Sequence, residues 1–166
     1  MTHDDQLLVV LANARVIFFD FDGPVCDVFA GLPTSQVAKQ LSALLASNDP
    51  VTAAKAYGTD DPIEVFRIAY EAGPELGQEV EQASTAAEVE AVAVSGPPTP
   101  GAVEALQTAN SSGRAVAVVS NNSAECVEHF VKAHGLGAYI AKVIGRPTGR
   151  PHLRGTVPGC AQSLAV

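Results

Sequence analysis

The sequence predicts an α/β protein: a doubly wound parallel sheet of the Rossmann-like type that carries an inserted α-helical cap. Three short apolar runs rich in β-branched residues, at 15–20, 114–119 and 139–144, predict buried strands. Helical patterns separate these runs, and strands that are apolar on both faces are typical of a parallel sheet covered by helices. Crossovers between parallel strands are right-handed, so the strands and helices wind into a layered core.

The length and composition set limits on this fold. A chain of 166 residues suits one domain with a modest insert, and the three cysteines lack the paired spacing of a disulfide framework or a zinc site. With 18 acidic and 10 basic residues, the net charge of −8 argues against a nucleic-acid partner. No apolar window reaches the roughly 18 residues of a membrane span, and the acidic N-terminus is unlike a signal peptide. We therefore expect a soluble, cytoplasmic protein without a membrane partner.

The first predicted strand ends in a segment that carries charge. Asp20 and Asp22 follow it at i and i+2, and Gly23 and Pro24 then break any regular element. Both carboxylates can point into one pocket, where their repulsion requires a cation or a shared proton. Mg²⁺ satisfies this need, one carboxylate can attack phosphorus, and the other can transfer the proton of the leaving group. Gly23 lets the backbone approach a phosphate closely.

Residues 34–92 are expected to be helical throughout. An apolar i, i+4, i+8 pattern begins at Val37, and Asp60 or Asp61 precedes a first-turn proline as a helix cap would. The stretch 75–92 is rich in Glu and Ala, and we expect a solvated helix face there rather than a binding surface.

The chain then returns to the sheet. The Pro- and Gly-rich segment at 96–101 predicts a rigid linker, so residues 1–30 and 97–166 are assigned to the core domain and 31–96 to the helical cap. Helices are expected over 101–112 and from 124 to 134.

The second predicted strand also ends in polar residues. Ser120, Asn121 and Asn122 follow it directly, just before a predicted helix. Ligands bind at the carboxyl ends of the strands in an open parallel sheet, and a helix N-terminus offers oriented amides to an anion. Together with the two aspartates after the first strand, this pattern favours a phosphate site.

These two segments resemble the first two motifs of the haloacid dehalogenase-like hydrolase superfamily. Residues 16–25 resemble the first motif and 117–122 the second, and the likeness extends over 15–150. The helix-filled spacing of about 100 residues resembles the phosphoglycolate-phosphatase-like subgroup, which has an α-helical cap between these motifs.

The resemblance implies a Mg²⁺-dependent hydrolase of a small phosphorylated metabolite. Asp20 would be the nucleophile and a metal ligand. Asp22 would be the general acid and base, and its backbone carbonyl would bind the metal. Ser120 and the backbone of Asn121 would hold the phosphoryl group, next to the backbone that Gly23 allows to approach it. The sequence has no pattern that indicates an oligomeric state.

The chain departs from the family pattern near its end. The family places a Lys after the third strand, where this chain offers Arg154 as a possible phosphate-binding charge and Lys142 as a poorer candidate. The family also has a fourth strand that ends in Asp, but no Asp follows Asp61. We therefore expect a truncated or frameshifted member whose sequence departs near Leu153. The alternative to an active hydrolase is an impaired member that keeps the fold and at most binds phosphate or a partner.

Three further residues are weaker candidates. Arg67 and Tyr70 on the insert are possible substrate contacts, although packing and surface solvation are favoured for both. Cys26 lies close to the first motif and is expected to make only a loop contact.

Overall fold

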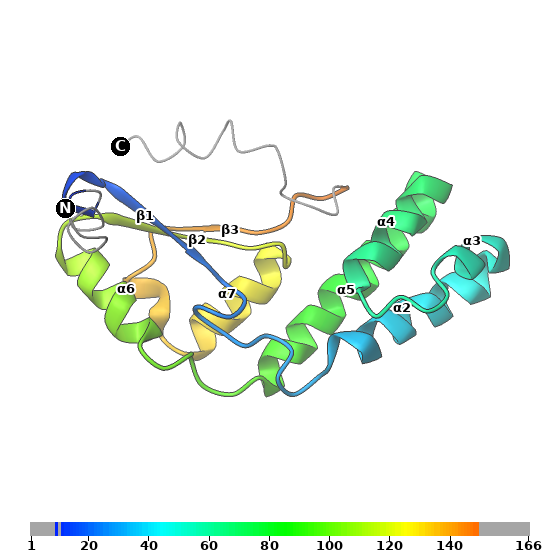
Figure 1. Ribbon diagram of the computed structural model, residues 1–166, viewed down its shortest axis with the longest axis horizontal. Helices are drawn as coiled ribbons and strands as arrows, with labels where there is room; N and C mark the ends of the chain where they lie inside the picture. Colours follow the sequence, from blue (N-terminus) through cyan, green and yellow to red (C-terminus); the bar gives the residue numbers. More distant parts are fainter. Residues whose placement is uncertain (1–8, 10, 150–166) are drawn as a thin grey trace.

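The computed structural model describes residue 9 and residues 11–149, which form a three-stranded parallel sheet and a set of helices (Figure 1). Strands β1 (Val16–Asp20), β2 (Ala115–Val119) and β3 (Lys142–Ile144) lie side by side in that order. Asp20 pairs with Val119, and Val119 pairs with Ile144, so all three strands end at the same edge of the sheet. The parallel sheet flanked by helices confirms the predicted α/β fold class.

Two helices cover one side of this sheet. Helices α6 (Ala102–Ser111) and α7 (Ala124–Ala133) lie below it in Figure 1. The ring of Phe21 meets the ring of Phe130 on α7 edge to face, with centroids 5.5 Å apart, and both side chains are fully buried. This aromatic pair anchors the loop after β1 to the core.

The third strand is shorter than predicted. Helix α7 ends at Ala133 with His134 as its C-cap, Gly135 adopts a left-handed conformation with φ of 66°, and a 3-10 turn, η1 (Leu136–Ala138), follows. The strand starts only at Lys142. The prediction of a strand from 139 was wrong at its beginning because the apolar residues there pack around the buried turn at Leu136 instead of extending.

The insert consists of four helices, which confirms its helical character. They are α2 (Thr34–Asn48), α3 (Pro50–Lys55), α4 (Pro62–Ala72) and α5 (Pro74–Val94). Asp61 is the N-cap of α4, and its side chain accepts a hydrogen bond of 2.9 Å from the backbone N–H of Ile63. Helix α5 packs against α2 and α4 and also reaches α7 of the core. The boundaries of the cap domain at 31 and 96 stay a prediction.

The two connections between insert and core lie side by side. A Cβ atom on Gly31 would come within 2.6 Å of the carbonyl oxygen of Val94, so only glycine allows this crossing. The Thr99 hydroxyl donates a 2.7 Å hydrogen bond to the carbonyl of Gly23. The linker that returns from the insert is therefore tied to the loop that follows β1.

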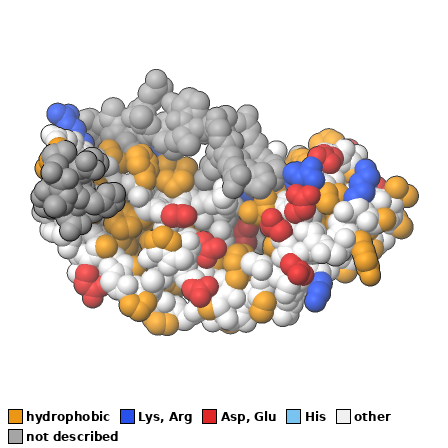
Figure 2. Space-filling model, in the orientation of Figure 1, with side chains coloured by type: hydrophobic (Ala, Val, Ile, Leu, Met, Phe, Trp, Pro, Cys, Tyr) orange, Lys and Arg blue, Asp and Glu red, His pale blue; other side chains and the backbone are white. Residues whose placement is uncertain are grey.

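The visible surface reflects the acidic composition. Figure 2 shows Asp and Glu side chains spread over the middle of one face, with apolar side chains between them. Lys and Arg side chains are fewer in the part of this face that the structure describes. Among the described residues, no helix combines the length and apolar character that crossing a bilayer requires.

Candidate active site

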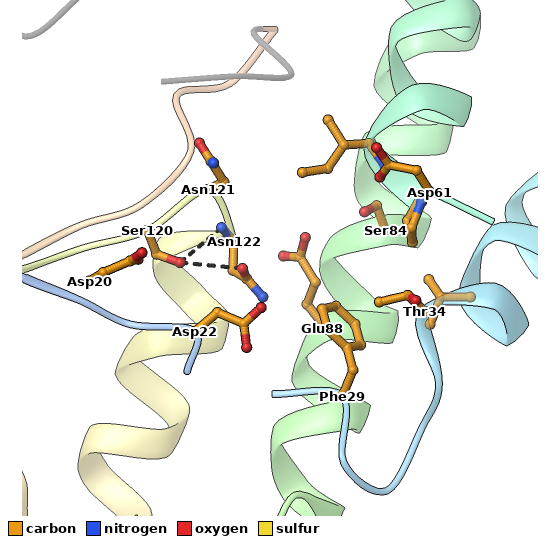
Figure 3. Close-up of a pocket in the computed structure, with 13 residues that line it drawn as sticks. Asp20, Asp22, Phe29, Thr34, Asp61, Ser84, Glu88, Ser120, Asn121 and Asn122 are labelled. Atoms are coloured by element: carbon orange, nitrogen blue, oxygen red, sulfur yellow. Dashed lines mark hydrogen bonds between the residues drawn. The ribbon is translucent and has the colours of Figure 1, made fainter. Parts of the chain in front are cut away.

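A cavity of about 310 Å³ lies where β1 and β2 end (Figure 3). Its core side is lined by Asp20, Asp22, Ser120, Asn121 and Asn122. The structure thus brings together both predicted aspartates and two of the predicted phosphate ligands. This happens because the parallel register aligns the ends of the two strands.

Gly23, a third predicted phosphate ligand, is not among the described residues that line this cavity. Gly23 has a φ of 94°, a conformation that favours glycine, and it allows the chain to turn sharply after Asp22. Arg154 and the predicted departure near Leu153 lie outside the described residues.

The loop after β2 is held by its own polar side chains. Ser120 is buried, and its Oγ accepts a 3.0 Å hydrogen bond from the backbone N–H of Asn122 and lies 3.3 Å from Asn122 Oδ1. The Ser120 N–H donates to the carbonyl of Ile144. Sequence reasoning gave Asn122 no role, because nothing in a single sequence distinguishes a buried amide from an exposed one.

The segment after β3 packs directly against the start of α7. A Cβ atom on Gly145 would lie 2.2 Å from the backbone nitrogen of Ala124. Ser123 caps α7 through its side chain, which accepts from the N–H of Cys126. Glycine at 145 therefore sets how closely the segment after β3 approaches the start of α7 and the loop that precedes it.

Asp22 is held in a defined orientation by the turn after β1. Its Oδ1 accepts a 3.2 Å hydrogen bond from the backbone N–H of Val28. Partial desolvation raises the pKa of Asp22 above its ordinary value, the charges of Asp27 and Asp20 add to this, and the Val28 hydrogen bond opposes it. Asp22 is thus a carboxyl group beside two like charges.

The far side of the cavity comes mainly from the insert. Thr34 of α2, Asp61 and Ile63 at the start of α4, and Ser84 and Glu88 of α5 line it. None of these was predicted as a site residue. Asp61 was predicted only as a helix cap, which it is.

The expectation of a solvated face over 75–92 was wrong for part of α5. Glu81 is 9% exposed and Glu88 only 4% exposed. Glu88 accepts a 2.8 Å hydrogen bond from the backbone N–H of Ser123, and its other oxygen pairs with Arg146. Buried carboxylates are stable only with such partners, and these partners come from the core, far away in the sequence.

Arg146 is a further residue that the sequence analysis did not assign to the site. Its Nη1 lies 2.6 Å from Glu88 Oε1 and 2.9 Å from the carbonyl of Asn121. The guanidinium also lies over the ring of Phe66, 5.2 Å from its centroid. Its Nε and Nη2 are buried without a hydrogen-bond partner in the part of the chain that the structure describes. Arg146 therefore links the insert to the loop after β2.

Comparison with known proteins agrees with the site. A family model described as haloacid dehalogenase-like hydrolase matches residues 14–153. The chain belongs to the haloacid dehalogenase-like hydrolase family. The expected resemblance is thereby confirmed at the level of the family, and the phosphoglycolate-phosphatase-like subgroup stays a prediction. No curated protein matches the sequence.

Several solved structures of haloacid dehalogenase-like proteins are similar to this chain at low identity. L-2-haloacid dehalogenase from Xanthobacter autotrophicus is 16% identical over 80% of this chain and 56% of its own, with a TM-score of 0.41. A subfamily IA hydrolase from Geobacter sulfurreducens is 17% identical over 82% and 66%, with a TM-score of 0.45. A magnesium-bound hydrolase from Bacillus subtilis is 14% identical over 80% and 65%, with a TM-score of 0.40. The chain spans about two thirds or less of the length of these proteins.

Asp20 and Asp22 fit Mg²⁺ as part of its ligand set. Two carboxylates at the same strand end supply the hard oxygen ligands that this ion prefers, and the charge of one raises the pKa of the other. Within residues 11–149, no group of three or more His, Cys, Asp or Glu is arranged to hold a metal ion. Water and phosphate oxygens would have to complete the site, as is common for Mg²⁺.

The weaker candidates lie away from the cavity. Arg67 forms surface ion pairs with Glu64 and Glu71. Tyr70 packs within the insert and donates a 2.6 Å hydrogen bond to Glu81. Cys26 is fully buried and lies 3.4 Å from the Ser95 hydroxyl. None of the three lines the cavity, so the packing and solvation interpretations hold for them.

Proposed function

We propose that this haloacid dehalogenase-like protein is a Mg²⁺-dependent phosphomonoester hydrolase that acts on a small phosphorylated metabolite. One observation carries the proposal: Asp20 and Asp22 from the end of β1 line the same cavity as Ser120 from the end of β2. Two carboxylates and a buried hydroxyl are the groups that phosphoryl transfer through an aspartate requires.

The proposed reaction has two steps. A carboxylate oxygen of Asp20 attacks phosphorus, the bond from phosphorus to the ester oxygen breaks, and Asp22 donates a proton to the leaving oxygen. Water then attacks the phosphorus of the aspartyl-phosphate while Asp22 accepts its proton. The bond between phosphorus and Asp20 breaks, which releases inorganic phosphate and regenerates both carboxyl groups.

Ser120 and Asn121 are the residues proposed to hold the phosphoryl oxygens. Ser120 is 2% exposed, and its hydroxyl is fixed by Asn122. The Ser120 side chain therefore loses little conformational entropy when phosphate binds. The Asp20 carboxylate and the Asp22 carbonyl would hold Mg²⁺. When bound, the ion would supply positive charge against the phosphoryl oxygens.

Hydrolysis of an aryl phosphate with Mg²⁺ tests this function. We expect turnover that falls by about 10²–10³ or more in Asp20→Asn, and that falls on removal of the metal with a chelator. Asp60→Asn is the matched control, because Asp60 is an exposed aspartate of the insert that does not line the cavity. Circular dichroism checks that each variant is folded. Chloride release from a 2-haloacid without any phosphatase activity would contradict the proposal.

The second candidate is a catalytically impaired member of the family. It is favoured by the composition of the cavity, since no Lys, Arg or His is among the described residues that line it. Phosphoryl transfer usually needs positive charge besides the metal. Turnover that equals that of Asp20→Asn, together with binding of inorganic phosphate to the wild-type protein, would favour this candidate.

We also propose that the protein resides in the cytoplasm. Cys26 and Cys126 are both free thiols and both buried. Unpaired cysteines are typical of proteins in reducing compartments. Fractionation of cells that express the tagged protein tests the location, and recovery outside the cytoplasmic fraction would contradict it.

A further inference from the structure

The wall of the cavity that faces Asp20 carries hydrogen-bonding groups that the proposed chemistry does not use. Ser84 and Glu88 lie on α5, and Asp61 lies at the start of α4 (Figure 3). In the proposed reaction, the phosphoryl group sits at Asp20 and the leaving group occupies the remaining space. The leaving group therefore contacts this wall.

Ser84 is the most informative residue of the wall. The residue is 3% exposed, and its side-chain hydroxyl makes no hydrogen bond within the described part of the chain. Two other serines in the insert, Ser47 and Ser95, instead donate to the backbone carbonyls of Leu44 and Val92. Figure 3 shows the Ser84 side chain on the side of α5 that faces the cavity. Unlike Nε and Nη2 of Arg146, the Ser84 oxygen is not fully enclosed by protein, so this hydroxyl is available to a ligand or water in the cavity.

The charge of the wall limits what the ligand can be. Glu88 and Asp61 present carboxylates, and the described residues around the whole cavity include no basic side chain. Each oxygen of Glu88 receives one hydrogen bond, from Arg146 or from the Ser123 N–H, and a carboxylate oxygen can accept two. The carboxylate of Asp61 likewise accepts only from the Ile63 N–H within the described residues. The wall therefore offers hydrogen-bond acceptors. The charge of Glu88 is compensated by Arg146, whereas the Asp61 carboxylate forms no ion pair among the described residues and repels negative charge.

We propose that the leaving group of the substrate bears hydroxyl or ammonium donors and no carboxylate, and that Ser84 is a specificity-determining residue for it. This inference rests on the proposed phosphomonoester hydrolysis. The cavity volume of about 310 Å³ is at the low end for ligand sites, which fits a leaving group of few carbons. The preference excludes phosphoglycolate as the favoured substrate.

Three two-carbon phosphate esters with the same skeleton test the inference. They are 2-hydroxyethyl phosphate, 2-aminoethyl phosphate and 2-phosphoglycolate, which end in a hydroxyl, an ammonium and a carboxylate. Their binding to the Asp20→Asn protein with Mg²⁺ is measured by calorimetry, so that no turnover interferes. We expect the hydroxyl and ammonium esters to bind about tenfold more tightly than phosphoglycolate, or better.

Substitutions in the wall identify the residues responsible. Ser84→Ala, added to Asp20→Asn, should weaken binding of the hydroxyl and ammonium esters about three- to tenfold and leave phosphoglycolate binding unchanged. Asp61→Asn keeps the helix cap. It should reduce the difference in affinity between phosphoglycolate and the other two esters. Thr85→Ala is the matched control, because Thr85 is the next residue on α5 and does not line this cavity.

Each outcome decides something. Phosphoglycolate that binds as tightly as the other esters, or no binding by any ester, overturns the inference, and equal effects of Ser84→Ala and Thr85→Ala overturn the role of Ser84. Aryl phosphate turnover by the wild-type protein reports separately on the proposed function. If the aryl phosphate is hydrolysed while phosphoglycolate binds best, only the specificity inference fails. If the aryl phosphate is not hydrolysed but the expected order of binding holds, only the proposed hydrolysis fails.

Discussion

Glu88 and Arg146 form a buried ion pair that joins the insert to the core. Arg146 Nη1 lies 2.6 Å from Glu88 Oε1, and the two side chains are 1% and 6% exposed. Arg146 also donates to the carbonyl of Asn121, and Glu88 accepts from the N–H of Ser123. The pair thus holds α5 against both ends of the loop that follows β2, and it sets the distance between the two walls of the cavity.

Removal of one partner of this pair should destabilise the protein strongly. Arg146→Met leaves the Glu88 carboxylate buried without its cation, which typically costs about 3–5 kcal/mol of unfolding free energy. Urea denaturation measures the change. Arg67→Met is the matched control, because the ion pairs of Arg67 are solvent-exposed and should contribute far less. An equal loss of unfolding free energy in the two variants would show that the buried Glu88–Arg146 pair stabilises the protein no more than an exposed pair does.

A side chain at Gly145 should disturb the loop after β2, which is proposed to hold the phosphoryl group. In Gly145→Ala the new Cβ would meet the backbone nitrogen of Ala124 at 2.2 Å, and a backbone neighbour cannot rotate away. We expect a loss of about 1–3 kcal/mol in stability, accompanied by weaker phosphate binding. Gly137→Ala serves as the comparison, since its Cβ would meet nothing closer than 3.9 Å. Melting curves and phosphate titrations of both variants measure these effects.

Tyr70 should titrate at unusually high pH. Desolvation, then the hydrogen bond to Glu81 and its negative charge, raise the pKa of Tyr70 to about 12 from 10. A folded-state pKa above the unfolded one stabilises the fold below pH 10, and this contribution is lost as pH rises from 10 to 12. When phenolate absorbance is followed against pH, the wild-type protein should show a component that titrates near pH 12 and that Tyr70→Phe lacks. A wild-type titration with all three tyrosines near pH 10 would refute this.

The buried thiols should be unreactive in the native protein. Desolvation raises the pKa of Cys26 to about 11 and that of Cys126 further, and both side chains are fully buried. Thiol reagents attack thiolates that solvent can reach. In a Cys160→Ser background at mildly alkaline pH, we expect no rapid reaction until denaturant exposes two thiols. Fast labelling of the native protein would mean that the contact between Cys26 and Ser95, near the linker from the insert, opens readily.

Local patterns in the sequence predicted much of this fold. The first strand was expected over 15–20 and the second over 114–119, and each starts one residue later in the structure. Asp61 caps α4 as expected. These features depend on hydrophobic periodicity and on turn and cap chemistry, which act over a few residues. The third strand was less well predicted, because an apolar run of this length is compatible with a turn packed into the core.

The wall of the cavity on the insert side was not predictable in the same way. The acidic stretch that contains Glu88 has the composition of a solvated face, and nothing in the sequence distinguishes Ser84 from other helical serines. Both residues owe their role to the way α5 packs against α7 and the segment after β3. A helix rich in Glu and Ala shows no sharp apolar stripe from which this packing can be deduced.

Local sequence patterns are sufficient to predict the core side of the cavity. Asp20 and Asp22 follow one strand and Ser120 follows another, and parallel strands bring their carboxyl ends to one edge. Only the tertiary structure decided what faces these residues: the free hydroxyl of Ser84, and Glu88 held by Arg146. The physical reason is that strand ends follow from short-range periodicity, whereas the wall depends on contacts between residues 58 positions apart. Such contacts exist only once α5 has docked on the core.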